Sequence, residues 1–284
     1  MSLEWERQYP GLSKCGISAS AVSNSGFLKT AALGHRVLIV EHCPRAFVAA
    51  FLTAAERGCV VFLADAGWSL SRLEPLLRLV RPHFVIGNLP TGGAPLAPIP
   101  QPPLRGTQPA IMIATGGSSE GIRLAVHTWD TLRIAAEGLW AYFGRGPLNF
   151  CCMLPLYHVS GLMQVMRALI SGGELSFHDY SLLAAGRLPS GDPTDTLTSL
   201  VPTQLKQLLQ NSAAVGWLRR LRAILLGGGP ASEELLETAR GMGLPLAPCY
   251  GMTETAAAIT IPVSYTHLRA HETREDMLLR GLIE

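Results

Sequence analysis

The sequence predicts an α/β protein in which helices cover parallel β-sheets. Short β-branched runs alternate with amphipathic stretches of ten or more residues, a pattern typical of βαβ units. Hydrophobic residues make up 48% of the 284 residues and charged residues only 15%, so the chain is too apolar for a disordered protein and too poor in charge for a coiled coil. At this length it can bury a large core, as one large domain or two smaller ones.

The first part of the chain predicts a βαβαβ unit. Strands are expected at 37–40, 60–64 and 84–86, and helices at 45–57 and 69–80. Within the second helix, Leu70, Leu73, Leu77 and Val80 recur at intervals of three and four residues, the period of a helix with one buried face. Seven prolines between positions 90 and 109 can neither continue a helix nor donate to a sheet, so this segment is expected to link two subdomains.

A second alternation of strands and helices follows the linker. Strands are expected at 110–114, 150–154, 196–201 and 223–226, and helices at 130–142, 161–170, 203–209 and 232–242. Residues 1–262 are therefore expected to form one large domain of two α/β subdomains. The tail 263–284 is richer in charge, and its spacing alone would fit an exposed amphipathic helix. Its run 263–273 resembles translated adapter sequence, so we expect the tail to be artefactual and without function.

Charge, hydropathy and cysteine usage exclude several classes of protein. The 23 basic and 21 acidic residues leave a net charge of +2 without a clustered basic face, so no nucleic-acid partner is expected. Apolar runs such as 46–55 are too short to span a membrane, and Glu4 and Glu6 are unlike a signal peptide, so a cytoplasmic location is expected. The six cysteines form no CxxC pair, which favours reduced core thiols over a redox role.

The strongest local signal is Thr-Gly-Gly-Ser-Ser-Glu-Gly-Ile-Arg at 115–123, directly after an apolar strand. Its glycines and hydroxyls are suited to cradle a phosphate, although the same composition also fits a hairpin turn. A Walker A loop would require Lys-[Ser/Thr] where Ile122-Arg123 stands. The elbow of α/β hydrolases would make Ser119 a nucleophile and requires a helix to follow, whereas 123–128 is strand-like.

Three further motifs follow expected strands. His158 lies in Leu-Pro-Leu-Tyr-His-Val-Ser-Gly at 154–161, where it could line a ligand pocket or merely begin a helix. The run Leu-Gly-Gly-Gly-Pro at 226–230 could let a flat ligand approach the backbone, or form only a tight turn. In Cys-Tyr-Gly-Met-Thr-Glu-Thr at 249–255, Thr253 could bind an anion or cap a helix, and Glu254 offers the oxygen that Mg²⁺ prefers.

Together the four motifs resemble those of the adenylate-forming superfamily of acyl-CoA synthetases. The match to Tyr-Gly-Met-Thr-Glu-Thr is highly specific, and the resemblance runs from about Arg36 to Ile261. Residues 121–129 and 157–164 are most similar to o-succinylbenzoate–CoA ligases of menaquinone and phylloquinone biosynthesis. The resemblance implies the large N-terminal domain of this fold, with layered α/β sheets. It also implies a reaction in which ATP and a small carboxylic acid form an acyl-adenylate and pyrophosphate, after which CoA captures the acyl group.

The resemblance implies a role for each matching residue. Thr115, Ser118 and Ser119, in a loop that includes Gly116, Gly117 and Gly121, would hold the triphosphate, and Arg123 replaces the lysine usual near that loop. Gly227, Gly228, Gly229 and Tyr250 would flank adenine, with Gly251 and Met252 in the same nucleotide site. Thr253 would contact the α-phosphate, Glu254 would bind Mg²⁺ and His158 would shape the pocket for the acyl carboxylate. Metal and N–H donors would offset the charge that accumulates at the α-phosphorus.

The chain departs from the family pattern in three places. Arg123 keeps the charge of the usual lysine but changes its geometry. No Thr-Gly-Asp occurs downstream of residue 255, and Ser190-Gly-Asp192 lies upstream. The last lysine is Lys206, so the adenylating lysine of the C-terminal domain is missing. We therefore expect a large domain without its lid and with little activity alone. A non-catalytic nucleotide-binding module and, less favoured, a hydrolase using Ser119 are the alternatives.

Overall fold

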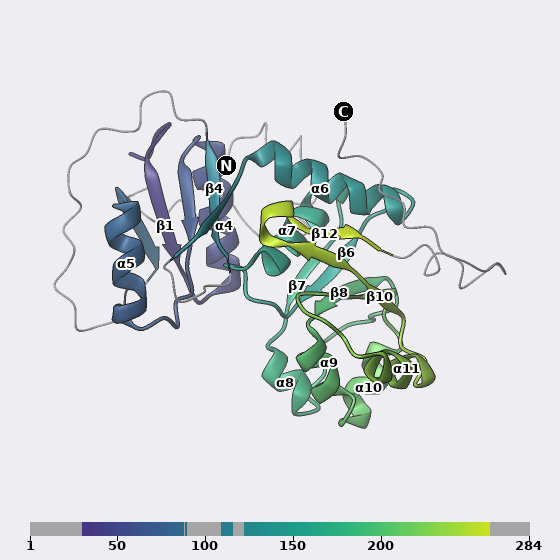
Figure 1. Ribbon diagram of the computed structural model, residues 1–284. Coiled ribbons are helices and arrows are strands. Elements are labelled where there is room, and N and C mark those ends of the chain that lie inside the picture. The colour runs from purple at the N-terminus through teal and green to yellow at the C-terminus, as the bar shows by residue number, and fades with distance from the viewer. Residues whose placement is uncertain (1–29, 88, 90–108, 116–121, 262–284) are drawn as a thin grey trace.

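The computed structural model describes residues 30–87, 89, 109–115 and 122–261. Two five-stranded sheets and a small two-stranded sheet form its framework, and helices cover both larger sheets (Figure 1). This is the α/β architecture that the alternating pattern predicts. In this part of the chain no helix is long and apolar enough to cross a membrane.

The first sheet is built around the βαβαβ unit. Its strands are β1 (Arg36–Val40), β2 (Val60–Leu63), β3 (Phe84–Gly87), β4 (Ala110–Ala114) and β5 (Leu124–His127), in the order β3-β1-β2-β4-β5, with only β5 antiparallel to its neighbour. Helix α4 (Pro44–Glu56) packs with Val37 and Ile39, whereas α5 (Leu70–Val80) packs with Leu38 and Val40. Because successive residues of a strand point to opposite faces, the two helices cover opposite sides of the sheet.

The second sheet is entirely parallel. Its strands are β6 (Asn149–Cys152), β7 (Leu175–Phe177), β8 (Thr196–Leu200), β9 (Ala223–Leu226) and β10 (Leu246–Pro248), in the order β10-β9-β8-β6-β7. Helices α6 (Trp129–Tyr142) and α7 (Val159–Ser171) cover one face. The helices α9 (Pro202–Leu208), α10 (Ser212–Leu218) and α11 (Glu233–Gly241) cover the other, with α8 (Tyr180–Ala184) packed beside α9.

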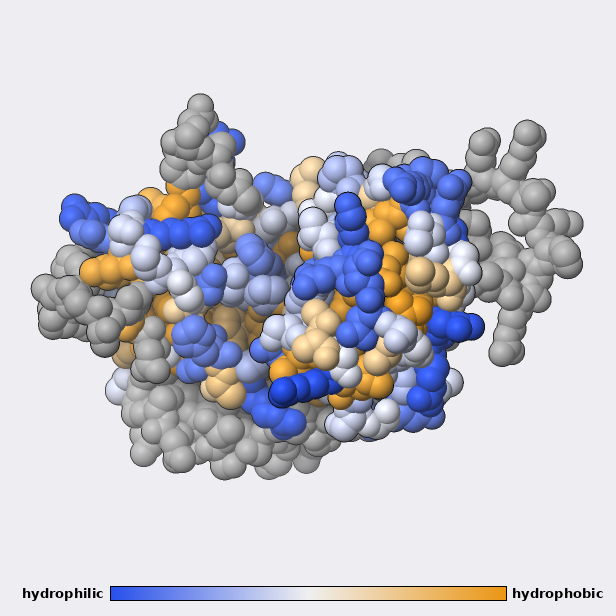
Figure 2. Space-filling model, turned by 90° about the horizontal axis from the view of Figure 1, so that it is seen from below, coloured by the Kyte–Doolittle hydropathy of each residue, from blue (hydrophilic) through white to orange (hydrophobic). Residues whose placement is uncertain are grey.

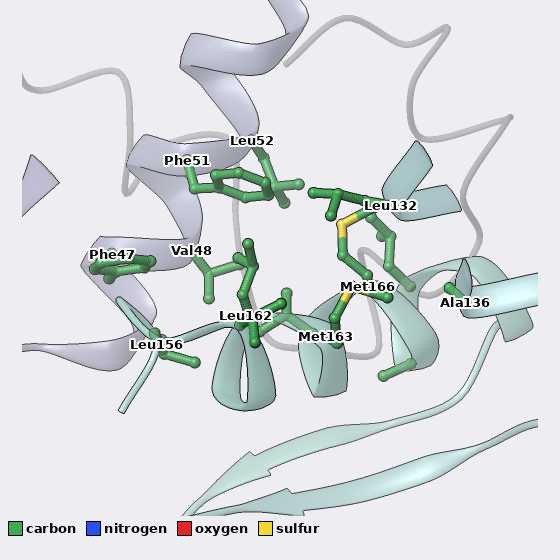
Figure 3. Packing of buried hydrophobic residues seen from close by; sticks show 14 of the residues in the cluster. Phe47, Val48, Phe51, Leu52, Leu132, Ala136, Leu156, Leu162, Met163 and Met166 are labelled. Carbon is green, nitrogen blue, oxygen red and sulfur yellow. The ribbon is translucent and has the colours of Figure 1, made fainter. Parts of the chain in front are cut away.

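One hydrophobic core joins the two larger sheets. Phe47, Val48, Phe51 and Leu52 of α4 lie against Leu162, Met163 and Met166 of α7, with Leu132 of α6 beside them (Figure 3). The segments on either side of the proline-rich linker therefore pack as layers of one structure. On the face seen from below, apolar side chains are interspersed among polar ones (Figure 2).

A short hairpin completes the described chain. Strands β11 (Tyr250–Met252) and β12 (Ala257–Thr260) are antiparallel and flank the 3₁₀ turn η2 (Thr253–Thr255). β12 contacts α6 and α7, and η2 contacts β5 of the first sheet. The hairpin, yellow in Figure 1, thus connects the end of the second sheet to the edge of the first.

Every element that the sequence predicts between residues 36 and 242 is present, with ends that differ by a few residues. The sequence analysis does not predict β7, α8, α10, η2 or the strands after residue 245. Most of these elements have three to five residues, too few for a periodic pattern to show. The tail 263–284 and most of the proline-rich linker lie outside the described residues.

Candidate active site

The base of the glycine-rich loop lies where β4 ends and β5 begins. The backbone N–H of Thr115 donates to the carbonyl oxygen of Arg123 at 3.0 Å, which closes the hairpin. Gly116, Gly117, Ser118, Ser119 and Gly121 lie outside the described residues, so their roles stay predictions. The residues after the loop form strand β5 and not a helix, so the strand–turn–helix context of a hydrolase elbow is not present at Ser119.

The Tyr-Gly-Met-Thr-Glu-Thr motif forms β11 and η2 and is anchored to β5. Nε2 of His127, a side chain only 3% exposed, lies 2.7 Å from the carbonyl oxygen of Thr253. His127 lies four residue steps along the extended chain from Arg123 at the loop base, a distance of about 13 Å. One strand therefore carries the base of the glycine-rich loop near one end and the contact to η2 at the other.

Within this motif, one threonine has a structural role and three side chains face solvent. The backbone N–H of Met252 donates to the hydroxyl of Thr255 at 3.1 Å, which closes the 3₁₀ turn. Tyr250, Met252 and Glu254 are exposed and available to a ligand. Gly251 is required because a β-carbon there would overlap the carbonyl oxygen of Ala257. Thr255 is therefore explained by the turn, whereas packing does not explain the identity of the three exposed residues.

The triple-glycine turn after β9 has a mixed explanation. A β-carbon on Gly227 would lie 2.9 Å from Sγ of Cys249, and Gly228 adopts a φ of +80°. Gly229 has open space where a β-carbon would lie, and Gly228 and Gly229 are both exposed. Packing explains Gly227, and backbone conformation explains Gly228. The predicted role, close approach of a ligand to the backbone, therefore remains the main explanation for Gly229 alone.

His158 lies between β6 and α7, as predicted, and directly precedes the helix. The residue is exposed, and its ring lies 4.4 Å from the ring of Tyr157, centroid to centroid. Desolvation lowers the pKa of His158 below its ordinary value, opposed by the negative charge of Asp65 and assisted by Arg72. The imidazole is therefore mainly neutral at pH 7 and can donate or accept a hydrogen bond.

Parallel pairing brings three of the motifs to one edge. β6, β8, β9 and β10 are parallel neighbours, so His158, the glycine turn and Tyr250 all follow carboxyl ends of the same sheet. Two strand spacings of about 4.8 Å separate β9 from β6, so the glycine turn and the loop that leads to His158 begin about 10 Å apart. Ligands of open α/β sheets bind at such an edge.

The sequence analysis missed two buried polar side chains of α7 beside this edge. Gln164 and Arg167 are 0% and 2% exposed, and the Gln164 Oε1, Arg167 Nε and Arg167 Nη2 atoms have no hydrogen-bond partner within the described part of the chain. Burial lowers the pKa of Arg167 to about 10, with a small opposing effect from the thiol of Cys249, the residue before Tyr250. A buried guanidinium with two unpartnered nitrogens is costly unless a ligand binds it. An arginine within Val-Ser-Gly-Leu-Met-Gln-Val-Met-Arg-Ala-Leu-Ile-Ser was the available sequence signal.

The carboxylate of Glu254 at η2 fits a magnesium ion that would also be bound by the phosphates of a nucleotide. Glu254 is exposed at the turn, and the described residues contain no group of three His, Cys, Asp or Glu side chains that could hold a metal by themselves. Mg²⁺ typically binds one or two carboxylates together with substrate phosphates and water. A single carboxylate beside a nucleotide site meets that requirement.

A family model for AMP-binding enzymes matches residues 90–276 of the chain. The chain belongs to the AMP-binding enzyme family. Two curated relatives are a probable 2-succinylbenzoate–CoA ligase of Mycobacterium tuberculosis, 33% identical over 171 residues, and the 2-succinylbenzoate–CoA ligase of Escherichia coli K12, 36% identical over 149 residues. These matches cover 56% and 52% of this chain but 44% and 31% of the relatives. The chain therefore spans less than half the length of these relatives.

Solved structures share the fold over most of the chain. Wild-type E. coli MenE with a bound analogue of OSB-AMS has a TM-score of 0.66 and 25% identity, and the match covers 89% of this chain and 56% of that one. The O-succinylbenzoate coenzyme A synthetase of Bacillus subtilis in complex with AMP has a TM-score of 0.70 and 19% identity, with 91% and 75% coverage. The predicted fold, that of the large domain of adenylate-forming enzymes, is confirmed.

Proposed function

We propose that this chain supplies the nucleotide- and acid-binding domain of an ATP-dependent acid–CoA ligase. The acid carboxylate attacks the α-phosphorus of ATP, a P–O bond to pyrophosphate breaks, and the thiol of CoA then displaces AMP from the acyl-adenylate. The observation that carries the proposal is the placement of three family motifs at one sheet edge, with the fourth anchored to it through His127 and Thr253. Such an edge can assemble donors from several strands around one nucleotide.

We assign the roles of individual residues as part of this proposal. Thr115, with the hydroxyls and glycines of 116–121, holds the triphosphate, and Arg123 contributes positive charge at the loop base. Gly229 and Tyr250 contact the adenine, with Gly227, Gly228, Gly251 and Met252 shaping the backbone around it. Thr253 contacts the α-phosphate, and neutral His158 borders the acyl carboxylate. Glu254 would hold Mg²⁺, which when bound offsets the negative charge of the phosphates.

We propose o-succinylbenzoate as the acid. This molecule carries a second carboxylate besides the one that is activated, and the buried guanidinium of Arg167 lacks partners for two of its nitrogens within the described chain. A carboxylate is the anion that best matches an arginine fork. The names of the curated relatives point to the same acid.

The nucleotide site is tested with the variant Glu254→Gln. We expect it to slow acid-dependent pyrophosphate release by roughly 100-fold, about 3 kcal/mol of barrier. Where the chain alone does not turn over, the readout is Mg²⁺-dependent ATP binding by calorimetry. Glu174→Gln is the matched control, since Glu174 is exposed and directly precedes β7, at the amino ends of the parallel strands. Equal losses in both variants would contradict the assignment. Nucleotide binding without any acid-dependent adenylate, in a chain extended to the full length of the relatives, would favour a non-catalytic module.

The acid is tested with the variant Arg167→Met. We expect affinity for o-succinylbenzoate to fall by roughly 100-fold, because the second carboxylate loses its partner. Affinity for benzoate, which has one carboxylate, should stay unchanged. The free energy of unfolding should not fall and could rise by about 1–4 kcal/mol, since an uncompensated buried charge is removed. Equal affinity of Arg167→Met and the unmodified chain for o-succinylbenzoate would exclude this acid-binding role.

A further inference from the structure

A cleft of about 530 Å³ lies between the two larger sheets on the side of Tyr157. Its walls include Glu41 and Asp65, which follow β1 and β2, and Leu154 and Tyr157, which follow β6. The first two residues belong to the part of the chain before residue 90, where the match to the family model begins. The βαβαβ unit thus contributes side chains to the surroundings of the candidate acyl site.

Asp65 is held in a fixed orientation toward Tyr157. The backbone N–H of Gly67 donates to Oδ1 of Asp65 at 2.8 Å. Asp65 and Tyr157 line the same cleft, and hydrogen bonding with Asp65 contributes to the raised pKa of Tyr157. The Trp68 ring meets the Tyr157 ring edge-on, with 6.4 Å between centroids. The guanidinium of Arg72 lies 4.5 Å from the centroid of Trp68. We call Asp65, Trp68 and Arg72 the clamp.

The clamp reaches His158 through Tyr157. The Tyr157 and His158 rings lie 4.4 Å apart at an interplanar angle of 49°, so the orientation of one restricts the other. Tyr157 is half-buried, with the clamp against it on one side and the His158 ring on another. A tyrosine bound in this way has few alternative rotamers, and its fixed ring limits where the imidazole can lie.

We propose that Asp65 is a positioning residue that acts through Tyr157 to hold His158 in place for the acid. The step from His158 to acid binding rests on the proposed function. The shared cleft and the ring contacts between Asp65 and His158 do not depend on it. The clamp therefore makes the βαβαβ unit part of the acid site.

The charges around these rings agree with this arrangement. Desolvation and the bond to Asp65 raise the pKa of Tyr157 to about 12, so its hydroxyl stays protonated and donates to Asp65. Asp65 and Arg72 act in opposite directions on the pKa of His158. The other titratable groups of the cleft are Glu41, His42, Cys152, His178, Asp179 and Tyr180. Three of these are engaged locally: Glu41 accepts from the N–H of Cys43, His178 contacts the Arg187 carbonyl and Asp179 caps α8.

The first experiment measures the pKa of His158 by NMR in the full chain without substrate. Asp65→Asn removes the charge that raises this pKa, so the titration should shift to lower pH than in the unmodified protein. Glu41→Gln is the matched control, because Glu41 is a carboxylate of the same cleft that bonds locally, and it should leave the titration unchanged. An unchanged His158 titration in Asp65→Asn would overturn the proposal.

The second experiment measures binding of o-succinylbenzoate and of ATP with Mg²⁺. Asp65→Ala and Tyr157→Phe should each weaken acid binding by roughly fivefold to tenfold, the effect of losing one ordinary hydrogen bond, while ATP affinity stays constant. Asp65→Asn can still accept the tyrosine hydrogen bond and should restore most of the acid affinity. Tyr157→Phe keeps the ring, so it serves where Asp65→Ala does not fold.

Unchanged acid affinity in Tyr157→Phe would overturn the proposal. If the unmodified chain binds no o-succinylbenzoate, the proposed function is wrong, and the NMR titration alone then decides the link from Asp65 to His158.

Discussion

Motif glycines at three positions of this chain are required by close backbone contacts. A β-carbon on Gly161 would overlap the carbonyl oxygen of Pro155, and one on Gly251 would overlap that of Ala257. A β-carbon on Gly227 would press against the thiol of Cys249. Each contact joins a site loop to a neighbouring segment. These glycines therefore hold the loops in place, which is a different role from contacting a ligand.

Gly161→Ala tests this explanation at α7. Because the added methyl group meets rigid backbone, we expect the free energy of unfolding to fall by about 1–3 kcal/mol, measured by urea denaturation. Gly138→Ala is the matched control in α6, where the structure has open space for a β-carbon. It should stabilise the protein by about 0.5–1 kcal/mol, because alanine favours a helix. Equal effects of the two substitutions would show that helix propensity dominates and packing does not.

At the scale of elements, helix α4 links the two larger sheets. One side of α4 packs on β1 and β2, and its buried phenylalanine and leucine side chains also lie against α7 (Figure 3). Helix α5 covers the opposite face of the first sheet, where its core is separate. The stability of the α4–α7 contact therefore affects both sheets at once.

Leu52→Ala tests this contact. Leu52 is fully buried in α4, so its truncation should lower the free energy of unfolding by about 2–5 kcal/mol. Leu79→Ala makes the same chemical change in α5 at a side chain that is 61% exposed, and should change stability by less than about 0.5 kcal/mol. Tryptophan fluorescence and circular dichroism should report one common transition in urea. Two separated transitions would contradict a shared core.

At the scale of the whole molecule, the five cysteines in the described part of the chain are free thiols, and most of them are buried or half-buried. Cys59, Cys151 and Cys152 are buried, Cys249 is half-buried and Cys43 is exposed, and all five are free. Burial raises the pKa of Cys59 to about 11 and that of Cys152 to about 12. The predicted location in the core is confirmed for Cys59, Cys151 and Cys152, and Cys249 lies at its margin. Cys15 lies outside the described residues.

These thiols predict a loss of stability in alkaline solution. The folded-state pKa values of Cys59 and Cys152 lie above the ordinary value of 9.0, so their contribution is fully present below pH 9. Above pH 9 the unfolded chain loses protons first, and the free energy of unfolding should fall between pH 9 and about 11. Cys152→Ala should reduce this slope in urea denaturation between pH 8 and 11. Cys43→Ala, at an exposed cysteine, should leave this slope unchanged. A slope equal in all three proteins would exclude the buried thiols as its cause.

The sequence predicted the long elements well and the short ones poorly. Helices such as α4 and α7 have three or more turns, so their hydrophobic period is visible in the residues alone. The hairpin of β11 and β12 has only seven strand residues and depends on contacts with α6 and α7. Local preference cannot specify such an element when its stability comes from distant residues.

The features of the candidate site likewise fall into those that the sequence predicts and those that only the packing of distant segments creates. By itself the sequence determined the family, the order of the four motifs and the residue types they carry, because these depend only on spacing and chemistry along the chain. Only the tertiary structure decided that His127 holds Thr253, that Arg167 is buried with unmet hydrogen bonds and that Asp65 reaches Tyr157. Asp65 and Tyr157 are 92 residues apart in sequence, and His127 and Thr253 are 126 apart. Contacts over such separations depend on how sheets and helices pack, which no local pattern records.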